Sequence, residues 1–412
     1  MPPHPAHRVI FRRTLLITAL VWLALTGCTS PGPSSAAQWI DAWGVSYLPT
    51  TINNAQPAGV PTFDHQTVRL NFLAKIAGAK ARIKFTNQYG SEPLEIGAAH
   101  IALRTNGDAI NPATDQMLTF AGAPSVTLAP GAEIWSDPAA ISIPQLADVS
   151  VSVYLPSRLK PTGFHLLGLK PAYLSAPGDF TSAASMPRPT SNPATTNSLF
   201  FVSDLQVLAP TSTKVIVAFG DSITDGANSD VDTNTSWPDV LAQRLANHGA
   251  NLYSVVNLGI GSNRVVSADA AGPSGLHRFA AEALSRANVT HIIVLEGIND
   301  ISYELAPPDQ IIAAYRQMIA QAHAKKIKIY GATLLPILNS RKYTPANEAT
   351  RAAVNQWIRT SGEFDAVLDF EHVVQDSANP LSIRPDLTRD YVHPNSAGYK
   401  LIAESINLSL FN

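Results

Sequence analysis

The sequence predicts an α/β fold in which a three-layer αβα domain with a five-stranded parallel sheet follows an all-β sandwich or jelly-roll domain. Two patterns lead to this prediction. After Pro210, strand-like apolar runs alternate with longer helical runs, which is typical of a parallel sheet covered by helices. Before Pro210, the apolar runs are short, turn residues separate them, and no long helical pattern occurs. A chain of 412 residues is long enough for two such domains.

The β-rich domain is expected over residues 38–210. In Thr67–Phe72 and in Ala81–Phe85, every second residue is apolar, as in a half-buried strand. The strands predicted in this domain are Thr67–Ile76, Lys80–Thr86, His100–Leu103, Val126–Leu128 and Asp148–Tyr154. Short strands broken by turn residues in this way indicate a sandwich or a jelly-roll.

The second domain is expected over residues 211–412, and it alternates between two kinds of apolar pattern. Its predicted strands are Val215–Phe219, Tyr253–Leu258, His291–Leu295, Ile327–Thr333 and Ala366–Phe370. Its predicted helices are Trp237–His248, Leu276–Ala287, Pro308–Lys325, Pro345–Thr360 and Ser396–Leu408. In a parallel sheet of this kind, ligands bind outside the carboxyl ends of the strands.

The overall composition excludes some classes of function. Charged residues make up 15% of the chain and the formal net charge is −2, so no basic excess exists to neutralise the phosphates of a nucleic acid. Cys28 is the single cysteine, which excludes an intramolecular disulfide and a cysteine-based zinc site. We expect no cofactor and no metal.

The beginning of the chain resembles an export signal. Arg8, Arg12 and Arg13 precede an apolar run from Leu15 to Leu25. That run has the length of the hydrophobic region of a signal peptide and is too short to span a bilayer as a helix. We therefore expect residues 1–27 to be a signal peptide.

The residues that follow the apolar run resemble the lipobox of bacterial lipoproteins. In that family, the cysteine of a segment such as Leu25–Cys28 is lipidated and becomes the mature N-terminus. The resemblance implies a lipid anchor at Cys28, a tether over residues 28–37, and a place in the cell envelope, with the protein held on a membrane. The alternative is an ordinary cleavage site, which would leave the protein periplasmic or secreted.

Residues suited to nucleophilic catalysis follow the first strand of the second domain. The segment Gly220–Gly226 reads GDSITDG and begins directly after strand Val215–Phe219. A tight turn between a strand and a loop, with Gly220 beside it, would expose Ser222 and direct a backbone N–H toward the reacting carbonyl. Taken alone, the tripeptide Gly220-Asp221-Ser222 also fits an ordinary turn built from these residue types.

Three further polar segments follow later elements of the same domain. Asn257–Arg264 contains glycines that allow a substrate to approach the backbone closely, and Gly297–Asp300 offers the Asn299 amide as a donor to an oxyanion. In the third segment, Asp390 stands three residues before His393 and precedes the last helix. A carboxylate in this place can orient the imidazole and stabilise its charged form.

The order of these four segments resembles the four sequence blocks of the SGNH/GDSL hydrolase family. The resemblance covers the whole second domain, and Asn87–Ala99, which reads NQYGSEPLEIGAA, is similar to the β-rich N-terminal domain of a bacterial branch of this family. It implies a serine ester hydrolase with Ser222 as nucleophile, His393 as general base and Asp390 as the residue that orients it. Its supporting residues would be Gly220, Asp221 and Asp300.

The resemblance also implies an oxyanion hole with three donors. These are the N–H of Ser222, a backbone N–H of the second block, and the side chain of Asn299. The family usually has glycine where this chain has Ser262, and Gly261 stands one place earlier. The second donor is therefore the N–H of either Ser262 or Gly261.

Two other functions remain open. A metallophosphoesterase could use a set of oxygen and nitrogen ligands, namely Asp221, Asp225, Asn299, Asp300 and His393. That function would leave Ser222 without a role. The second alternative is a non-catalytic envelope protein whose β-rich domain binds glycan. For the esterase, the substrate would be a small-molecule or polysaccharide ester, and both a carbohydrate deacetylase and a lipase-like esterase are compatible with the sequence.

Overall fold

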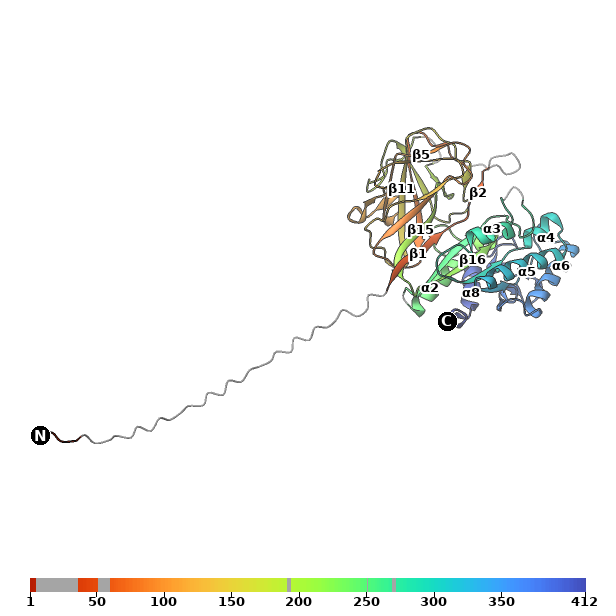
Figure 1. Cartoon of the computed structure of the whole chain (residues 1–412). Helices are drawn as coiled ribbons and strands as arrows, with labels where there is room; N and C mark the ends of the chain where they lie inside the picture. The colour runs from red at the N-terminus through yellow and green to blue at the C-terminus, as the bar shows by residue number, and fades with distance from the viewer. Residues whose placement is uncertain (5–35, 51–59, 191–193, 250, 269–271) are drawn as a thin grey trace. The chain divides into compact units, whose positions relative to one another are not determined.

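The computed structural model describes residues 1–4, 36–50, 60–190, 194–249, 251–268 and 272–412 (Figure 1). The predicted signal peptide, apart from its first four residues, and Cys28 lie outside these ranges. Among the residues described, no helix combines the length and the hydropathy that a membrane span requires. Residues 36–412 form one compact unit.

The N-terminal part of this unit is built from antiparallel sheets. One sheet has the order β1 (Ala37–Gly44), β15 (Val202–Pro210), β4 (Ala81–Thr86) and β10 (Glu133–Trp135). The other sheet has the order β14 (Thr195–Thr196), β13 (Ala172–Pro177), β3 (Gln66–Ala74), β11 (Ala147–Leu155), β6 (Ala98–Asn106) and β7 (Ala109–Ile110), and β8 (Gln116–Met117) also pairs with β6. Two short pairs are β2 (Leu48–Pro49) with β12 (Gly163–Phe164), and β5 (Leu94–Ile96) with β9 (Val126–Leu128).

These two main sheets pack face to face, which confirms the predicted β-rich fold. Trp43 of the first sheet stacks on Phe72 of the second, with ring centroids 4.1 Å apart. Val149, Val151 and Val153 of β11 place apolar side chains at every second position and are fully buried, and Ser150 and Ser152 between them are buried as well. Alternation of this kind places one set of side chains between the sheets, where they form the core.

The C-terminal part contains the predicted five-stranded parallel sheet. Its order is β17 (Tyr253–Gly259), β16 (Lys214–Gly220), β18 (Val289–Leu295), β19 (Lys328–Ala332) and β20 (Ala366–Leu368). The first strand in sequence, β16, therefore lies between the second and the third. In such an arrangement the direction of the chain switches at the carboxyl end of β16, which is where open α/β sheets bind their ligands.

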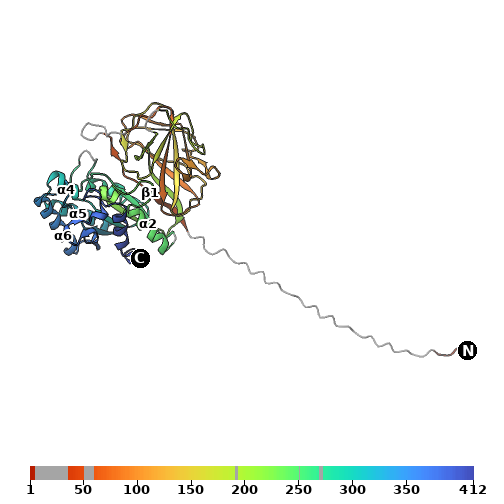
Figure 2. The same cartoon turned by 180° about the vertical axis from the view of Figure 1, so that it is seen from behind.

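Helices follow most of these strands (Figures 1 and 2). The longer helices are α2 (Trp237–His248), α3 (Gly275–Glu282), α5 (Pro308–Ala324), α6 (Pro345–Thr360) and α8 (Ser396–Ser405). The shorter helices are α1 (Ser222–Asp225), α4 (Ile298–Glu304) and α7 (Phe370–Val374). The helices α2 and α8 pack together, and α5 contacts both α3 and α6. A hairpin of β21 (Gln375–Asp376) and β22 (Asn379–Ile383) was not predicted.

Several predicted boundaries differ from the structure. The last strand ends at Leu368 because the side chain of Asp369 accepts the N–H of His372 and caps α7. The helix predicted to reach Ala287 ends at Glu282, and the helix predicted to reach Leu408 ends at Ser405. The strand β1 begins at Ala37, which the sequence placed in the tether.

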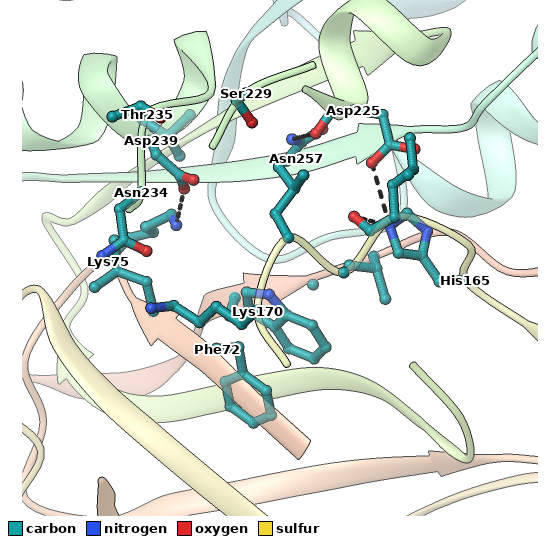
Figure 3. Close-up of a pocket in the computed structure, with 18 of the residues that line it drawn as sticks. Phe72, Lys75, His165, Lys170, Asp225, Ser229, Asn234, Thr235, Asp239 and Asn257 are labelled. Atoms are coloured by element: carbon teal, nitrogen blue, oxygen red, sulfur yellow. Dashed lines mark hydrogen bonds and ion pairs between the residues drawn. The ribbon is translucent and has the colours of Figure 1, made fainter. Parts of the chain in front are cut away.

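Polar contacts join the β-rich part to the parallel-sheet part. The Ser254 hydroxyl donates to the carbonyl oxygen of Asp41 at 2.5 Å, and Arg286 Nη1 lies 2.6 Å from Asp204 Oδ1. Lys75 and Asp239 form a buried ion pair between the same two parts (Figure 3). Residues 36–412 form one compact unit that is not divided at Pro210. The division into two domains at that residue therefore stays a prediction.

Candidate active site

The predicted nucleophile lies at the carboxyl end of β16. Ser222 is the first residue of α1, and the Asp221 side chain caps this helix by accepting the N–H of Ile223 at 2.9 Å. A side chain at Gly220 would place its Cβ 2.1 Å from the carbonyl oxygen of Leu295 on the neighbouring strand. Glycine at this position therefore allows the two strands to approach closely beneath the nucleophile.

The structure brings the three predicted triad residues together. Ser222 Oγ lies 2.8 Å from His393 Nε2, and His393 Nδ1 lies 2.7 Å from Asp390 Oδ2. A carboxylate can only accept a hydrogen bond, so Nδ1 carries the imidazole proton. Nε2 is then the acceptor for the Ser222 hydroxyl, which is the arrangement that a general base requires.

The loop that carries Asp390 holds its carboxylate in the charged form. Partial burial raises the pKa of Asp390, but hydrogen bonds from the His393 side chain and from the N–H groups of His393 and Val392 lower it well below its usual range. The Thr388 hydroxyl oxygen accepts the N–H of Tyr391 at 2.9 Å, which tightens the same turn. The acid is therefore ionised throughout the pH range in which an imidazole titrates.

The predicted oxyanion donors outside Ser222 follow β17 and β18, the two strands that pair with β16. Neither the Ser222 N–H nor the Ser262 N–H donates to any acceptor among the described residues. The Asn299 amide donates one N–H to the carbonyl oxygen of Asn263 at 2.9 Å and has a second N–H to offer. Ile260 donates its N–H to the carbonyl oxygen of Gly220 at 3.1 Å, so the second block is joined to the strand that precedes the nucleophile.

Backbone geometry distinguishes the two candidates for the second donor. Ser262 is exposed and adopts a φ of 64°, a left-handed conformation that favours glycine. The N–H of Gly261 faces the carboxylate of Asp225 and lowers the pKa of that group, against the larger opposite effect of burial. The left-handed backbone at Ser262, where the family usually has glycine, makes Ser262 the better candidate.

Two of the predicted supporting acids are buried beneath these donors. Asp300 accepts the N–H of Val265 at 2.9 Å and that of Val266 at 2.8 Å, and so anchors the loop after Ser262. Burial raises the pKa of Asp300 to about 6, and burial likewise raises that of Asp221 to about 6. Both carboxyl groups therefore have a structural role in holding the loops around the nucleophile.

Four buried ionisable residues near the site were missed in the sequence. They are His165, Arg278, Glu296 and Lys342. Arg278 donates to the carbonyl oxygens of Gly220 and Leu258, each at 2.9 Å, and thereby joins the ends of β16 and β17. Burial raises the pKa of Glu296 to about 8. Arg278 stands four residues before Glu282 on the same helix, and Glu296 directly precedes the predicted segment Gly297–Asp300, whereas His165 and Lys342 lie in segments with no motif.

His165 comes from the β-rich part of the chain and contacts the segment after the nucleophile (Figure 3). Its Nε2 lies 3.2 Å from Asp225 Oδ1 and 3.3 Å from the carbonyl oxygen of Leu167, while Nδ1 lies 2.9 Å from the carbonyl oxygen of Ser46. All these neighbours are acceptors, so a doubly protonated ring satisfies them. Burial lowers the pKa of His165, but Asp225 and the two carbonyl groups together raise it.

The residues of the alternative metal site have separate partners. Asp221 caps α1, Asp225 pairs with His165, and Asp300 binds the loop after Ser262. Among the described parts of the chain, no group of three or more histidine, cysteine, aspartate or glutamate side chains is placed to hold a metal ion. The geometry therefore favours the serine nucleophile over a metallophosphoesterase.

Comparisons with known proteins give one family match and several similar solved structures. Residues 218–401 match the model of the GDSL-like lipase/acylhydrolase family. Similar solved structures include a G-D-S-L-family protein from Desulfitobacterium hafniense DCB-2, with 26% identity, a TM-score of 0.38, and coverage of 47% of this chain and 97% of that one. The M. smegmatis aryl esterase has 17% identity, a TM-score of 0.39, and coverage of 47% and 97%. A carbohydrate acetylesterase family member from Sinorhizobium meliloti has 13% identity, a TM-score of 0.40, and coverage of 48% and 97%. No curated protein matches the chain.

Proposed function

We propose that the chain is a carboxylic ester hydrolase that cleaves esters through a Ser222–His393–Asp390 triad, because residues 218–401 match the GDSL-like lipase/acylhydrolase family. The observation that carries the proposal is the continuous hydrogen-bonded path from the Ser222 hydroxyl through His393 to Asp390. The imidazole presents Nε2 to the hydroxyl, and an ionised acid fixes its tautomer.

The proposed reaction has two steps. Ser222 Oγ attacks the ester carbonyl carbon while His393 Nε2 takes its proton, and the tetrahedral oxyanion binds the three donors. Collapse of this intermediate breaks the bond to the alkoxide, which leaves with the proton from His393. Water then repeats the sequence on the acyl-enzyme, releasing the carboxylic acid and restoring the serine.

The proposed substrate is an ester of a small acyl group on a larger alcohol, such as a sugar. The side chain of Asp390 is 42% exposed, and Ser262 lies at the surface, so the site is open on the side of the triad. An open site accepts a bulky alcohol without a deep channel. A panel of p-nitrophenyl esters of rising chain length, beside acetylated polysaccharides, separates this substrate class from long-chain lipids. Preference for long acyl chains would contradict it.

The nucleophile is tested by Ser222→Ala. The variant should lose ester hydrolysis and labelling by an organophosphonate, while its thermal unfolding stays close to that of the wild type. Ser405→Ala, which removes another hydroxyl in the parallel-sheet part, at the end of α8, is the control. Near-native turnover by Ser222→Ala would place the nucleophile elsewhere, and absence of ester hydrolysis by the wild-type protein would favour the non-catalytic alternative.

Export and anchoring are a separate proposal that rests on the sequence alone. Lipidation of Cys28 would hold the enzyme on a membrane of the cell envelope. Metabolic labelling with a palmitate analogue should mark the wild-type protein and not Cys28→Ser. A wild-type protein that takes up no label would be secreted or periplasmic instead.

A further inference from the structure

A buried lysine beside the proposed oxyanion hole has no role in the reaction as written. Lys342 lies in the loop between β19 and α6, and 6% of the residue is exposed. Among the described residues, no carboxylate forms an ion pair with its ammonium group, whereas Lys75, which is also buried, pairs with Asp239. Lysine is rarely buried without a partner of opposite charge, because removing the charge from water is costly.

The backbone around Lys342 is held in place. The Asn347 side-chain amide, at the start of α6, donates to the carbonyl oxygen of Lys342 at 2.8 Å. The N–H of Lys342 donates to the Ser340 hydroxyl at 3.1 Å. These contacts fix the base of the side chain, whose ammonium then extends to the first turn of α4.

The ammonium determines how the Asn299 amide is oriented. Lys342 Nζ donates to Asn299 Oδ1 at 2.5 Å. Because lysine has donors and no acceptor, it can only face the amide oxygen, so the amide nitrogen must lie on the other side. One N–H of that nitrogen donates to the carbonyl oxygen of Asn263, which leaves the second for the oxyanion. A reversed amide would present its oxygen there instead and repel the developing negative charge.

The surroundings of Lys342 are mixed in charge. The charged and titratable groups that face it are Asp221, Arg264, Tyr303, Arg341 and Asp390. The Tyr303 ring centroid lies 4.4 Å from Nζ, which stabilises a cation. Burial lowers the pKa of Lys342 to about 8, with Asp221 and Asp390 acting in the opposite direction. At neutral pH the ammonium is therefore charged, and it polarises the amide so that the free N–H is a stronger donor.

We propose that Lys342 is a positioning residue for ester hydrolysis, which holds the Asn299 amide with its N–H toward the oxyanion and strengthens that donor by its charge. This inference rests on the proposed function, because it needs a reaction in which an oxyanion forms. It assigns Lys342 no contact with the substrate.

The test is a double-mutant cycle with p-nitrophenyl acetate as substrate. Lys342→Met keeps the length of the side chain and removes the charge and the donors, so kcat should fall about tenfold or more with little change in KM, as expected for partial loss of one oxyanion donor. In the Asn299→Ala background, the same change should have little further effect on kcat, because the donor that it positions is already absent. Equal losses in both backgrounds, or an unchanged kcat in Lys342→Met, would overturn the proposal.

The pH profile provides a readout that a purely structural role would not change. In the wild type, kcat should fall above about pH 8 as the ammonium loses its proton. Lys342→Arg keeps the charge at all these pH values, so the alkaline loss should move to higher pH. An alkaline limb at the same pH in Lys342→Arg would contradict the proposal, even if Lys342→Met failed to fold.

Two controls separate this role from others. Lys75→Met removes another buried lysine, so it should lower the stability of the protein and leave kcat unchanged. Hydrolysis by the wild type that is lost in Ser222→Ala establishes the proposed function first. If that loss is seen and the effects of Lys342→Met and Asn299→Ala on kcat are additive, the proposed role of Lys342 is wrong and the proposed function still holds.

Discussion

The loop that carries Ser262 and the helix that carries Asn299 follow the two strands that flank β16 and the proposed nucleophile, but they are held by different kinds of contact. Buried carboxylates hold the loop: Asp300 accepts two of its N–H groups, and Asp225 faces a third. The Asn299 side chain on the helix is held by the Lys342 ammonium, which donates to its oxygen, and by the carbonyl oxygen of Asn263, which accepts from its nitrogen. The loop thus presents a backbone donor and the helix a side-chain donor.

The difference follows from the chemistry of each donor. A backbone N–H has a fixed direction once the loop is fixed, so acceptors for the neighbouring N–H groups are sufficient. An amide side chain has an oxygen and a nitrogen of nearly equal size, and only its partners decide which end faces the substrate. The loop therefore relies on acids, and the side-chain donor relies on a cation.

Loss of the buried His165–Asp225 ion pair, which lies next to the loop that carries Ser262, should have the largest effect on the protein. His165→Leu leaves the buried Asp225 carboxylate without its cation, which should reduce the free energy of unfolding by about 3–5 kcal/mol. The Gly261 N–H faces the same carboxylate, so kcat should fall as well. Urea denaturation and steady-state kinetics measure the two effects.

An exposed histidine pair is the control for this prediction. His323 Nε2 lies 2.9 Å from Asp365 Oδ2, with the histidine side chain 46% exposed, so His323→Leu should cost less than about 1 kcal/mol. The pKa of His165 is raised in the folded state, so the stabilisation is complete below the ordinary imidazole pKa and is lost as the pH rises through the raised value. Equal stability losses in both variants would show that burial of His165 is unimportant.

Removal of the side-chain donor should have the next largest effect. Asn299→Ala deletes one oxyanion donor, so kcat should fall by roughly 10²–10³, equivalent to about 2.7–4 kcal/mol of barrier, with KM nearly unchanged. Asn355→Ala is the matched control, because Asn355 is also 1% exposed but donates to Leu334 and Glu371, away from the nucleophile. A loss in KM instead of kcat would assign Asn299 to substrate binding.

The sequence predicted the parts of the site that a short motif can encode. Ser222, Asp390 and Asn299 each follow a strand or precede a helix, and the βα alternation places such positions at one edge of the sheet. His165 and Lys342 could not be found in this way. Their roles depend on a contact from a distant part of the chain and on a loop conformation, and neither leaves a pattern in the local sequence.

The choice between Gly261 and Ser262 as the second donor also could not be made from the local sequence. Sequence spacing allowed either N–H to be the second donor. The left-handed φ of 64° at Ser262 separates the two, and it is a property of the folded backbone. The left-handed conformation also explains why the family that this chain resembles usually has glycine at this position.

The smallest expected effect comes from replacing Ser262 by glycine, the residue that the family usually has at this position. A residue other than glycine costs about 1–2 kcal/mol in the left-handed conformation, and glycine costs roughly 0.5–1 kcal/mol in chain entropy. Ser262→Gly should therefore raise the free energy of unfolding by about 0.5–1 kcal/mol and leave kcat unchanged, because the backbone N–H remains. Lys326→Gly, at an exposed position with a φ of 60°, should give a similar gain in thermal unfolding. Proline is a poor substitute at position 262, since its ring fixes φ near −65° and would rearrange the loop. A fall in kcat for Ser262→Gly, with Lys326→Gly unchanged, would mean that the Ser262 hydroxyl takes part in the site and that the donor is not the backbone alone.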